Sequence, residues 1–100
     1  MTPIATTGFQ QLTVTTSAAT LASLCSGSVI PAETRHAIFY PEGQNVRWTT
    51  DGGNPTATVG MVMEADAQTV FENQRPIFDN MKVISANASS SATLNVSFFK

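Results

Sequence analysis

The sequence predicts a small all-β protein, an antiparallel β-sandwich or barrel of about seven or eight short strands, with one short helical segment near residues 17–25. Three observations support this fold class. First, apolar and polar residues alternate in several short runs, as in strands with one buried face. Second, groups of Gly, Pro, Asn, Asp and Ser separate these runs at intervals of about 8–12 residues. Third, 100 residues are enough for one domain of about 100–150 residues.

The beginning of the chain predicts an arm followed by a strand. Residues 1–8 are small and polar, and we expect an arm that is mobile or docks on a neighbouring molecule. Residues 9–100 are predicted to form a single β-sandwich domain, since no linker or internal repeat interrupts them. The first strand is Phe9–Thr15, where Leu12 and Val14 alternate with threonines.

Ser17–Cys25 is the segment expected to be helical. It contains several strong helix formers and neither glycine nor proline. Ser17 is the expected N-cap, and Leu21, Leu24 and Cys25 would form the apolar face. We expect one or two helical turns before the glycine and proline that follow.

Two β-hairpins are predicted in the middle of the chain. The strand Arg35–Tyr40 should pair with Asn45–Thr50 across the turn Pro41–Gln44. Ala37 and Phe39 share one face of its first strand.

The second predicted hairpin pairs Met61–Ala65 with Gln68–Glu72 around Asp66 and Ala67. Ile77 and Phe78 form a short apolar patch after a proline.

The last two predicted strands are Lys82–Ala86 and Thr93–Phe99, separated by a polar loop. Leu94, Val96 and Phe98 share one face of the final strand. The apolar end of this strand indicates that it lies inside a sheet rather than at its edge.

The stretch from Val46 to Met61 is the most informative part of the chain. A strand is followed by a turn in which Asp51 is expected to fold its carboxylate onto backbone amides. The two glycines that follow should supply positive φ, and Pro55 should hold Asn54 out of the helical region. The conformation of the turn explains why each of these residue types is present, so no bound ligand is needed to explain the stretch.

The composition favours packing against other proteins. Charged residues are only 12% of the chain, where about 25% is usual. Ala, Ser and Thr together supply 35 of the 100 residues. Since interface cores are similarly depleted in charge, we expect a homo-oligomer or another protein assembly, with a sparsely charged monomer as the alternative.

The charge pattern and hydropathy argue against nucleic-acid and membrane partners. The net charge is −2, and a phosphate-binding surface would need clustered cations. No apolar run approaches the roughly 18 residues of a membrane span. The first residues lack the basic and apolar regions of a signal peptide, so we expect synthesis and assembly in a cytoplasm. The basic residues are scattered along the chain: Arg35, Arg47, Arg75, Lys82 and Lys100.

No catalytic, cofactor-binding or metal-binding residue is predicted. Cys25 is the only cysteine and is interpreted as a small buried hydrophobe rather than a nucleophile. His36 is the only histidine, so one chain cannot form a histidine-based zinc cluster. A hydrolase that uses Cys25 and His36 is kept only as a remote alternative, because no motif joins them.

The acidic residues are interpreted as solvated. The turn at Asp51 lacks the regular ligand spacing and terminal glutamate of a calcium loop. A glycosidase-like carboxylate pair would need a cleft, for which a small core leaves little room. All seven carboxylates fall in predicted turns or near strand ends: Glu33, Glu42, Asp51, Glu64, Asp66, Glu72 and Asp79.

Three aromatic residues are candidates for a carbohydrate-stacking platform. Trp48 lies on a predicted strand next to Arg47, so their side chains face opposite ways. We expect Trp48 inside the core, and the same for Phe39 and Tyr40.

Three parts of the sequence resemble a group of small virion proteins of tailed bacteriophages. The first combines Asn45–Gly52 with Pro55–Met61, where a strand with Arg-Trp precedes an Asp-Gly turn, Pro-Thr-Ala and Gly-Met. The second is Glu64–Val70, and the third is the closing strand Ala92–Phe99. Together they span about the last two-thirds of the domain.

The resemblance implies a non-enzymatic structural protein, made in the bacterial host and carried in many copies on the virion. The first expectation is a capsid decoration or cement subunit that binds the major capsid protein. A neck or tail accessory protein is the alternative within this class, and a carbohydrate- or receptor-binding module is the alternative outside it. The chain departs from the pattern at Ser17–Cys25 and at Asn73–Pro76, where particle-specific contacts are expected.

Overall fold

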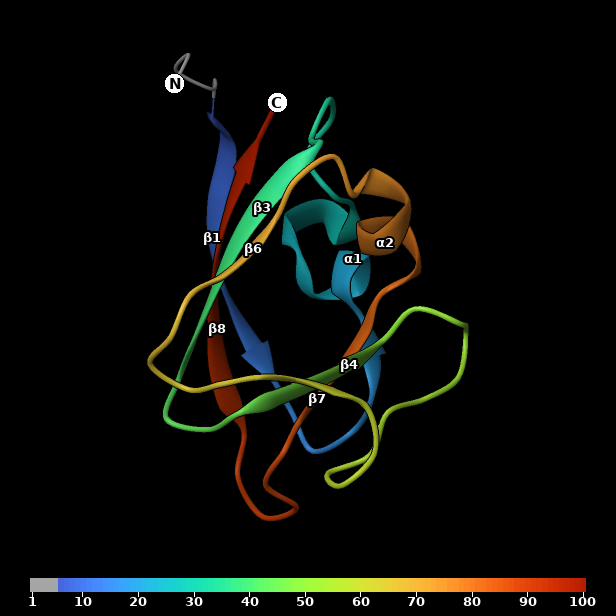
Figure 1. Cartoon of the computed structure of the whole chain (residues 1–100), viewed down its shortest axis with the longest axis vertical. Coiled ribbons are helices and arrows are strands. Elements are labelled where there is room, and N and C mark those ends of the chain that lie inside the picture. Colours follow the sequence, from blue (N-terminus) through green and yellow to red (C-terminus); the bar gives the residue numbers. More distant parts are fainter. Residues whose placement is uncertain (1–5) are drawn as a thin grey trace.

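Eight strands in two antiparallel four-stranded sheets, with two short α-helices, make up residues 6–100, the part of the chain that the computed structural model describes (Figure 1). The two sheets face each other and enclose the core between them. The predicted all-β class is confirmed, and of the two predicted architectures the structure has the sandwich.

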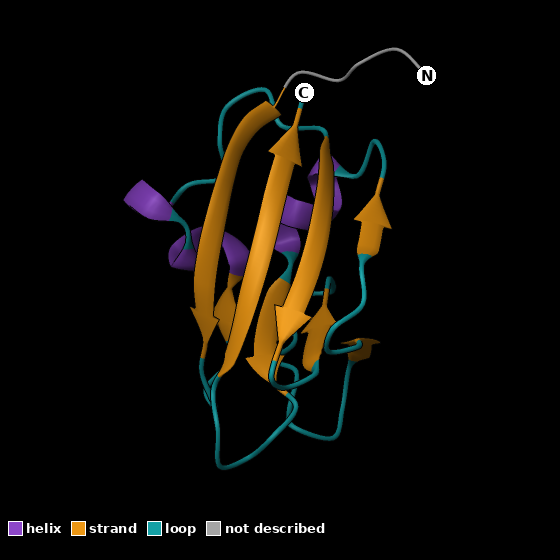
Figure 2. Ribbon diagram, turned by 90° about the vertical axis from the view of Figure 1, so that its left-hand side faces the viewer, coloured by secondary structure: helices purple, strands orange, loops and turns teal. Residues whose placement is uncertain are grey.

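The larger sheet, called sheet A, has the strand order β1-β8-β3-β6 (Figure 2). All its neighbours pair antiparallel, and β8 bonds to β1 on one side and β3 on the other. The final strand therefore lies inside the sheet, as predicted. The bounds are β1 Thr6–Val14, β3 His36–Glu42, β6 Thr69–Phe71 and β8 Ala92–Phe99.

The smaller sheet, called sheet B, has the order β2-β7-β4-β5. Its strands are shorter than those of sheet A, and β4 lies between β7 and β5. The bounds are β2 Ala19–Thr20, β4 Val46–Thr49, β5 Met61–Met63 and β7 Lys82–Ser85.

The predicted arm is partly a strand. Thr6 pairs with Phe99 and Gly8 with Phe98, so the last residues of the 1–8 segment belong to β1. Residues 1–5 lie outside the described residues. The chain extends its first strand because β8 offers a full-length partner beside it.

The helical segment near residues 17–25 is present but shorter than predicted. The helix α1 covers Leu21–Leu24, and its N-cap is Thr20 rather than Ser17, because the Thr20 hydroxyl accepts a bond from Ser23 N at 3.3 Å. The preceding residues pair with β7 and cannot be helical. A 3₁₀ turn, η1 (Ser26–Ser28), follows, with Gly27 at φ +71°.

A second helix, α2 (Arg75–Asn80), forms where only an apolar patch was predicted. Pro76 lies in its first turn, where an N–H group would have no hydrogen-bond partner within the helix, so the N–H that proline lacks is not missed. Phe78 is fully buried and holds the helix on the core. Six residues are too short to show a helical period in the sequence.

Both predicted hairpins are wrong. Strands β3 and β4 lie in different sheets, and so do β5 and β6. At each turn the chain crosses from one layer of the sandwich to the other. Gly43 turns the first crossing at φ +84°, and Asp66 lies in the second, where its amide donates to Pro41 O at 2.8 Å. A short polar turn between two strands does not by itself distinguish a hairpin from such a crossing.

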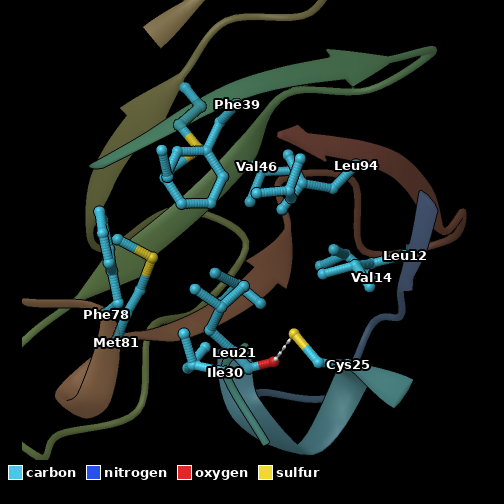
Figure 3. Close-up of a cluster of buried hydrophobic side chains, with 14 of the residues drawn as sticks. Leu12, Val14, Leu21, Cys25, Ile30, Phe39, Val46, Phe78, Met81 and Leu94 are labelled. Carbon is cyan, nitrogen blue, oxygen red and sulfur yellow. Dashed lines mark hydrogen bonds between the residues drawn. The ribbon is translucent and has the colours of Figure 1, made fainter. Parts of the chain in front are cut away.

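The core lies between the sheets, with α1 and α2 closing one end of it (Figures 1 and 3). The inner faces of the long strands supply most of it, as the alternation predicts. Four aromatic rings meet edge to face: Phe39 contacts Phe71 and Phe78 at centroid distances of 5.4 and 6.0 Å, and Trp48 contacts Phe71 at 5.4 Å. Such pairs add about 0.5–1.5 kcal/mol each beyond area burial.

Replacing Phe39 by Ala should strongly destabilise the domain. Its side chain is fully buried and contacts two other rings, so we expect a loss of about 3–5 kcal/mol in the free energy of unfolding. Urea unfolding followed by circular dichroism measures this loss. The control is Phe9→Ala, because Phe9 is 62% exposed and should shift stability by no more than about 0.5 kcal/mol. Equal losses in the two variants would contradict this description of the core.

Candidate functional site

The loop over residues 50–60 is held on the outer face of sheet B by two cations. Arg47 donates from Nε to Ala57 O at 3.0 Å and from Nη1 to Gly60 O at 2.9 Å. Lys82 Nζ donates to Gly52 O and to Asn54 Oδ1, both at 3.0 Å. Hydrogen bonds from charged donors are stronger than neutral ones, so the loop has a defined shape.

The turn inside this loop matches its sequence prediction except at one glycine. The Asp51 carboxylate accepts from Gly53 N at 2.9 Å, which is the expected turn. Gly52 has φ +86°, whereas Gly53 does not have positive φ. Gly60 has φ +132°, and a Cβ there would lie 3.1 Å from Trp48 O. The close approach of the loop to β4 therefore requires glycine at position 60.

An open hollow of about 290 Å³ lies where the loop leaves β4 and returns to β5. It has a mixed lining of one aromatic ring, one thioether, hydroxyls and a carboxylate. The volume is at the small end of the range of about 300–1,000 Å³ for ligand pockets. The lining residues are Trp48, Thr49, Thr50, Asp51, Gly60 and Met61.

Trp48 is half-buried at the border between core and hollow. The structure thus places it at the core, as predicted, but leaves part of it at the surface. Phe39 is fully buried, as expected, whereas Tyr40 is only half-buried and belongs to the outer face of sheet A.

Apolar side chains are exposed along the edge of sheet B next to the hollow. Met61 and Val62 on β5 are 61% and 42% exposed, and Val59 just before them is 61% exposed. β5 is an edge strand, paired only with β4. Among residues 6–100, no hydrogen bond outside that pairing engages the backbone of Met61, Val62 or Met63. The edge is short, apolar and open.

Figure 2 looks onto the outer face of sheet A, and few of the side chains on this face are charged. Its strand register forms rows across the sheet: Phe9, Ser97, Ile38 and Val70 lie side by side on the four strands. A neighbouring row contains Gln11, Asn95 and Tyr40. Glu42 and His36 are the only titratable groups besides Tyr40 on this face. The face consists of Phe9, Gln11, Thr13, Thr93, Asn95, Ser97, Phe99, His36, Ile38, Tyr40, Glu42 and Val70.

The structure does not bring Cys25 and His36 together as a catalytic pair. The Cys25 thiol is buried in the core and contacts Leu21 O at 3.4 Å (Figure 3). Burial raises the pKa of the Cys25 thiol, so the thiolate is disfavoured. His36 Nδ1 instead accepts a bond from Asn73 N at 3.1 Å. The interpretation of Cys25 as a buried hydrophobe is confirmed.

The two segments predicted to make particle-specific contacts, Ser17–Cys25 and Asn73–Pro76, support the core. Leu21 and Cys25 are buried, and Arg75 Nη1 donates to Pro31 O and Thr34 O at 3.2 and 3.1 Å. These segments therefore have structural roles, whatever surface they also present.

Within residues 6–100, no three His, Cys, Asp or Glu side chains gather where they could hold a metal ion. None of the helices in this part of the chain is long and apolar enough to cross a membrane.

The fold is a small two-sheet β-sandwich with two candidate contact surfaces, the outer face of sheet A and the open edge of β5. No protein-family model, curated protein or solved structure matches the chain. The function must therefore be argued from the surfaces described above.

Replacing Arg47 by Met should loosen the 50–60 loop. The methionine keeps the aliphatic length but leaves Ala57 O and Gly60 O without their donor. We expect a loss of about 1–3 kcal/mol in stability, and faster hydrogen exchange of amides in the loop. The control is Arg35→Met, because Arg35 is exposed. Unchanged exchange in the loop of the Arg47 variant would contradict the anchoring role.

The buried thiol should make stability fall at alkaline pH. The folded-state pKa of Cys25 is raised above its ordinary value of 9.0. This contribution to stability is present below the unfolded pKa and is lost as the pH rises through the folded pKa. Urea unfolding across this range should show a steeper decline for the native chain than for Cys25→Ala. Identical slopes would show that the thiol is not desolvated.

Proposed function

We propose that this chain is a non-enzymatic structural protein of a tailed-bacteriophage virion, specifically a capsid decoration or cement subunit that binds the major capsid protein in many copies. The observation that carries the proposal is the outer face of sheet A. In antiparallel sheets with one solvated face, apolar residues that point into the core usually alternate along each strand with polar residues that point to solvent. Here the outward positions include Phe9, Ile38 and Val70 in one row, and Glu42 is the only Asp, Glu, Lys or Arg residue among the outward positions.

A surface of this kind suits contact with another protein. Burying it would remove few charges from water, which is the costly part of forming an interface. Its polar side chains are already ordered by mutual bonds: Gln11 donates to Asn95 Oδ1 at 3.0 Å, and Asn95 donates to Tyr40 O at 3.2 Å. Pre-ordered side chains lose less entropy on binding.

Repetition on a particle would supply the remaining affinity. A modest contact gains avidity when several copies are joined in one oligomer, or when each copy binds two neighbouring partners. The resemblance of the 45–61 and 92–99 segments to small phage virion proteins supports this setting. A neck or tail accessory role uses the same surface at a lower copy number.

A carbohydrate-binding module is the second candidate, and the Trp48 hollow is the observation that favours it. An aromatic ring beside Thr49, Thr50 and Asp51 offers both a stacking surface and polar groups. Against it, Phe71 already packs edge to face on Trp48 at 5.4 Å. A Trp48 emission spectrum that is blue-shifted and resists quenching would remove its main support.

Cosedimentation with phage heads that lack this protein tests the proposal. We expect stoichiometric binding at roughly hundreds of copies per head, the order set by the number of equivalent sites on a symmetric capsid lattice. Binding at a few to about a dozen copies would place the protein at the neck or tail instead. No binding would overturn the virion role and favour the carbohydrate candidate.

A pair of matched variants assigns the binding surface in the same experiment. Phe9→Lys places a charge on the outer face of sheet A, where the native side chain is 62% exposed. Val29→Lys makes the same charge change at a residue outside that face, 57% exposed. We expect Phe9→Lys alone to reduce the bound copies, and equal binding by both variants would contradict the role of sheet A.

A further inference from the structure

We propose that the open edge of β5 captures an extended segment of a partner protein in which basic and apolar residues alternate. The inference deepens the proposed function by naming a second contact surface and the chemistry of its ligand, and in that respect it rests on the proposed function. It is argued from the backbone, the exposed apolar side chains and the charges around this edge.

The backbone of β5 provides the first argument. Only β4 pairs with this strand, and the outward backbone groups of Met61–Met63 have no partner among residues 6–100. An open edge bonds an added strand through its main chain, which is a common mode of peptide recognition. Natural edge strands are usually protected by short length, Lys, Pro or a bulge. β5 is short, with three residues, but Met-Val-Met contains neither Lys nor Pro.

The exposed side chains provide the second argument. Val59, Met61 and Val62 are three of the large apolar residues that the structure leaves exposed, and all lie at this edge or next to it. Met61 also lines the hollow with Trp48. An added strand would place alternate side chains on either face of sheet B. The hollow is positioned to receive one apolar side chain of that strand.

Charge decides the chemistry of the occupant. The segment over residues 51–72 contains four carboxylates and no lysine, arginine or histidine. All four carboxylates are exposed, and the two salt bridges among residues 6–100 use other acidic residues. The four are Asp51, Glu64, Asp66 and Glu72. Two cations also lie near this edge, Lys82 and the Arg47 that is opposite Val62, but both donate to oxygens of the 50–60 loop rather than to these carboxylates. The unpaired carboxylates attract a basic segment and disfavour a second copy of the same edge.

The crossing of the chain between the sheets carries two of these carboxylates, Glu64 and Asp66, directly after β5. β5 is the edge of sheet B and β6 the edge of sheet A, and residues 64–68 connect them. In Figure 1 this part of the chain runs across the front of the molecule. Glu64 and Asp66 therefore lie between the open edge of β5 and that of β6.

The test is a titration with a short peptide in which valine and lysine alternate, followed by amide chemical shifts and Trp48 fluorescence. We expect shifts confined to Met61–Met63, the loop over residues 50–60 and the Trp48 indole, and weaker binding at higher salt. A peptide in which valine and glutamate alternate should not bind. No binding of the lysine peptide, equal binding of both peptides, or shifts centred elsewhere would overturn the proposal.

Matched variants locate the contact. Val62→Lys puts a cation on the open edge, and we expect it to weaken peptide binding by about tenfold, through charge repulsion and loss of apolar contact. Val29→Lys makes the same charge change away from β5 and should bind like the native chain. If Val62→Lys binds the peptide normally, the β5 edge is not the site.

The outcomes separate this proposal from the proposed function. If the lysine peptide binds at β5 but the native protein never sediments with heads, the virion role fails and the β5 site stands. If heads bind the native protein and Val62→Lys equally well, the virion role stands and the β5 edge is not used on the particle. Dimerisation abolished by Val62→Lys would show that a second copy occupies the edge, and would overturn the proposal.

Discussion

The position of β8 in the middle of sheet A constrains the rest of the structure. β8 is hydrogen-bonded to β1 on one side and to β3 on the other, so its alternate side chains point either into the core or to the outer face of sheet A. Leu94, Val96 and Phe98 are fully buried in the core, whereas Asn95 and Ser97 form the centre of the outer face. A shift of β8 by one residue would exchange these two sets and destroy both the core and the low-charge outer face.

The cations of sheet B have a different role from surface charges in general. Arg47 and Lys82 donate to backbone and amide oxygens of the 50–60 loop, so they fix a conformation instead of neutralising carboxylates. Among residues 6–100, the carboxylates from Asp51 to Glu72 form no ion pair. Because Arg47 and Lys82 are engaged in anchoring the loop, they do not pair with these carboxylates.

The sequence was sufficient to predict those features of the structure that depend on residues close together in the chain. Alternation predicted the buried faces of β3 and β8, and residue chemistry predicted the turn at Asp51 and the burial of Cys25. It was insufficient where pairing is long-range. Both predicted hairpins are wrong because β3 pairs with β8 and β4 with β7, and no local signal encodes those partners. The open edge of β5 could not be predicted either, since an edge is defined by the strands that are not beside it.

The order of the strands also has a consequence during synthesis. Sheet A cannot form before residues 92–99 have left the ribosome, because β1 and β3 are joined only through β8. Until then β1 and β3, with buried side chains such as Leu12 and Phe39, have no completed sheet to join. Since long-range β pairing is slow and exposes strand edges, the nascent chain has an interval in which a holding chaperone would raise the yield of native protein.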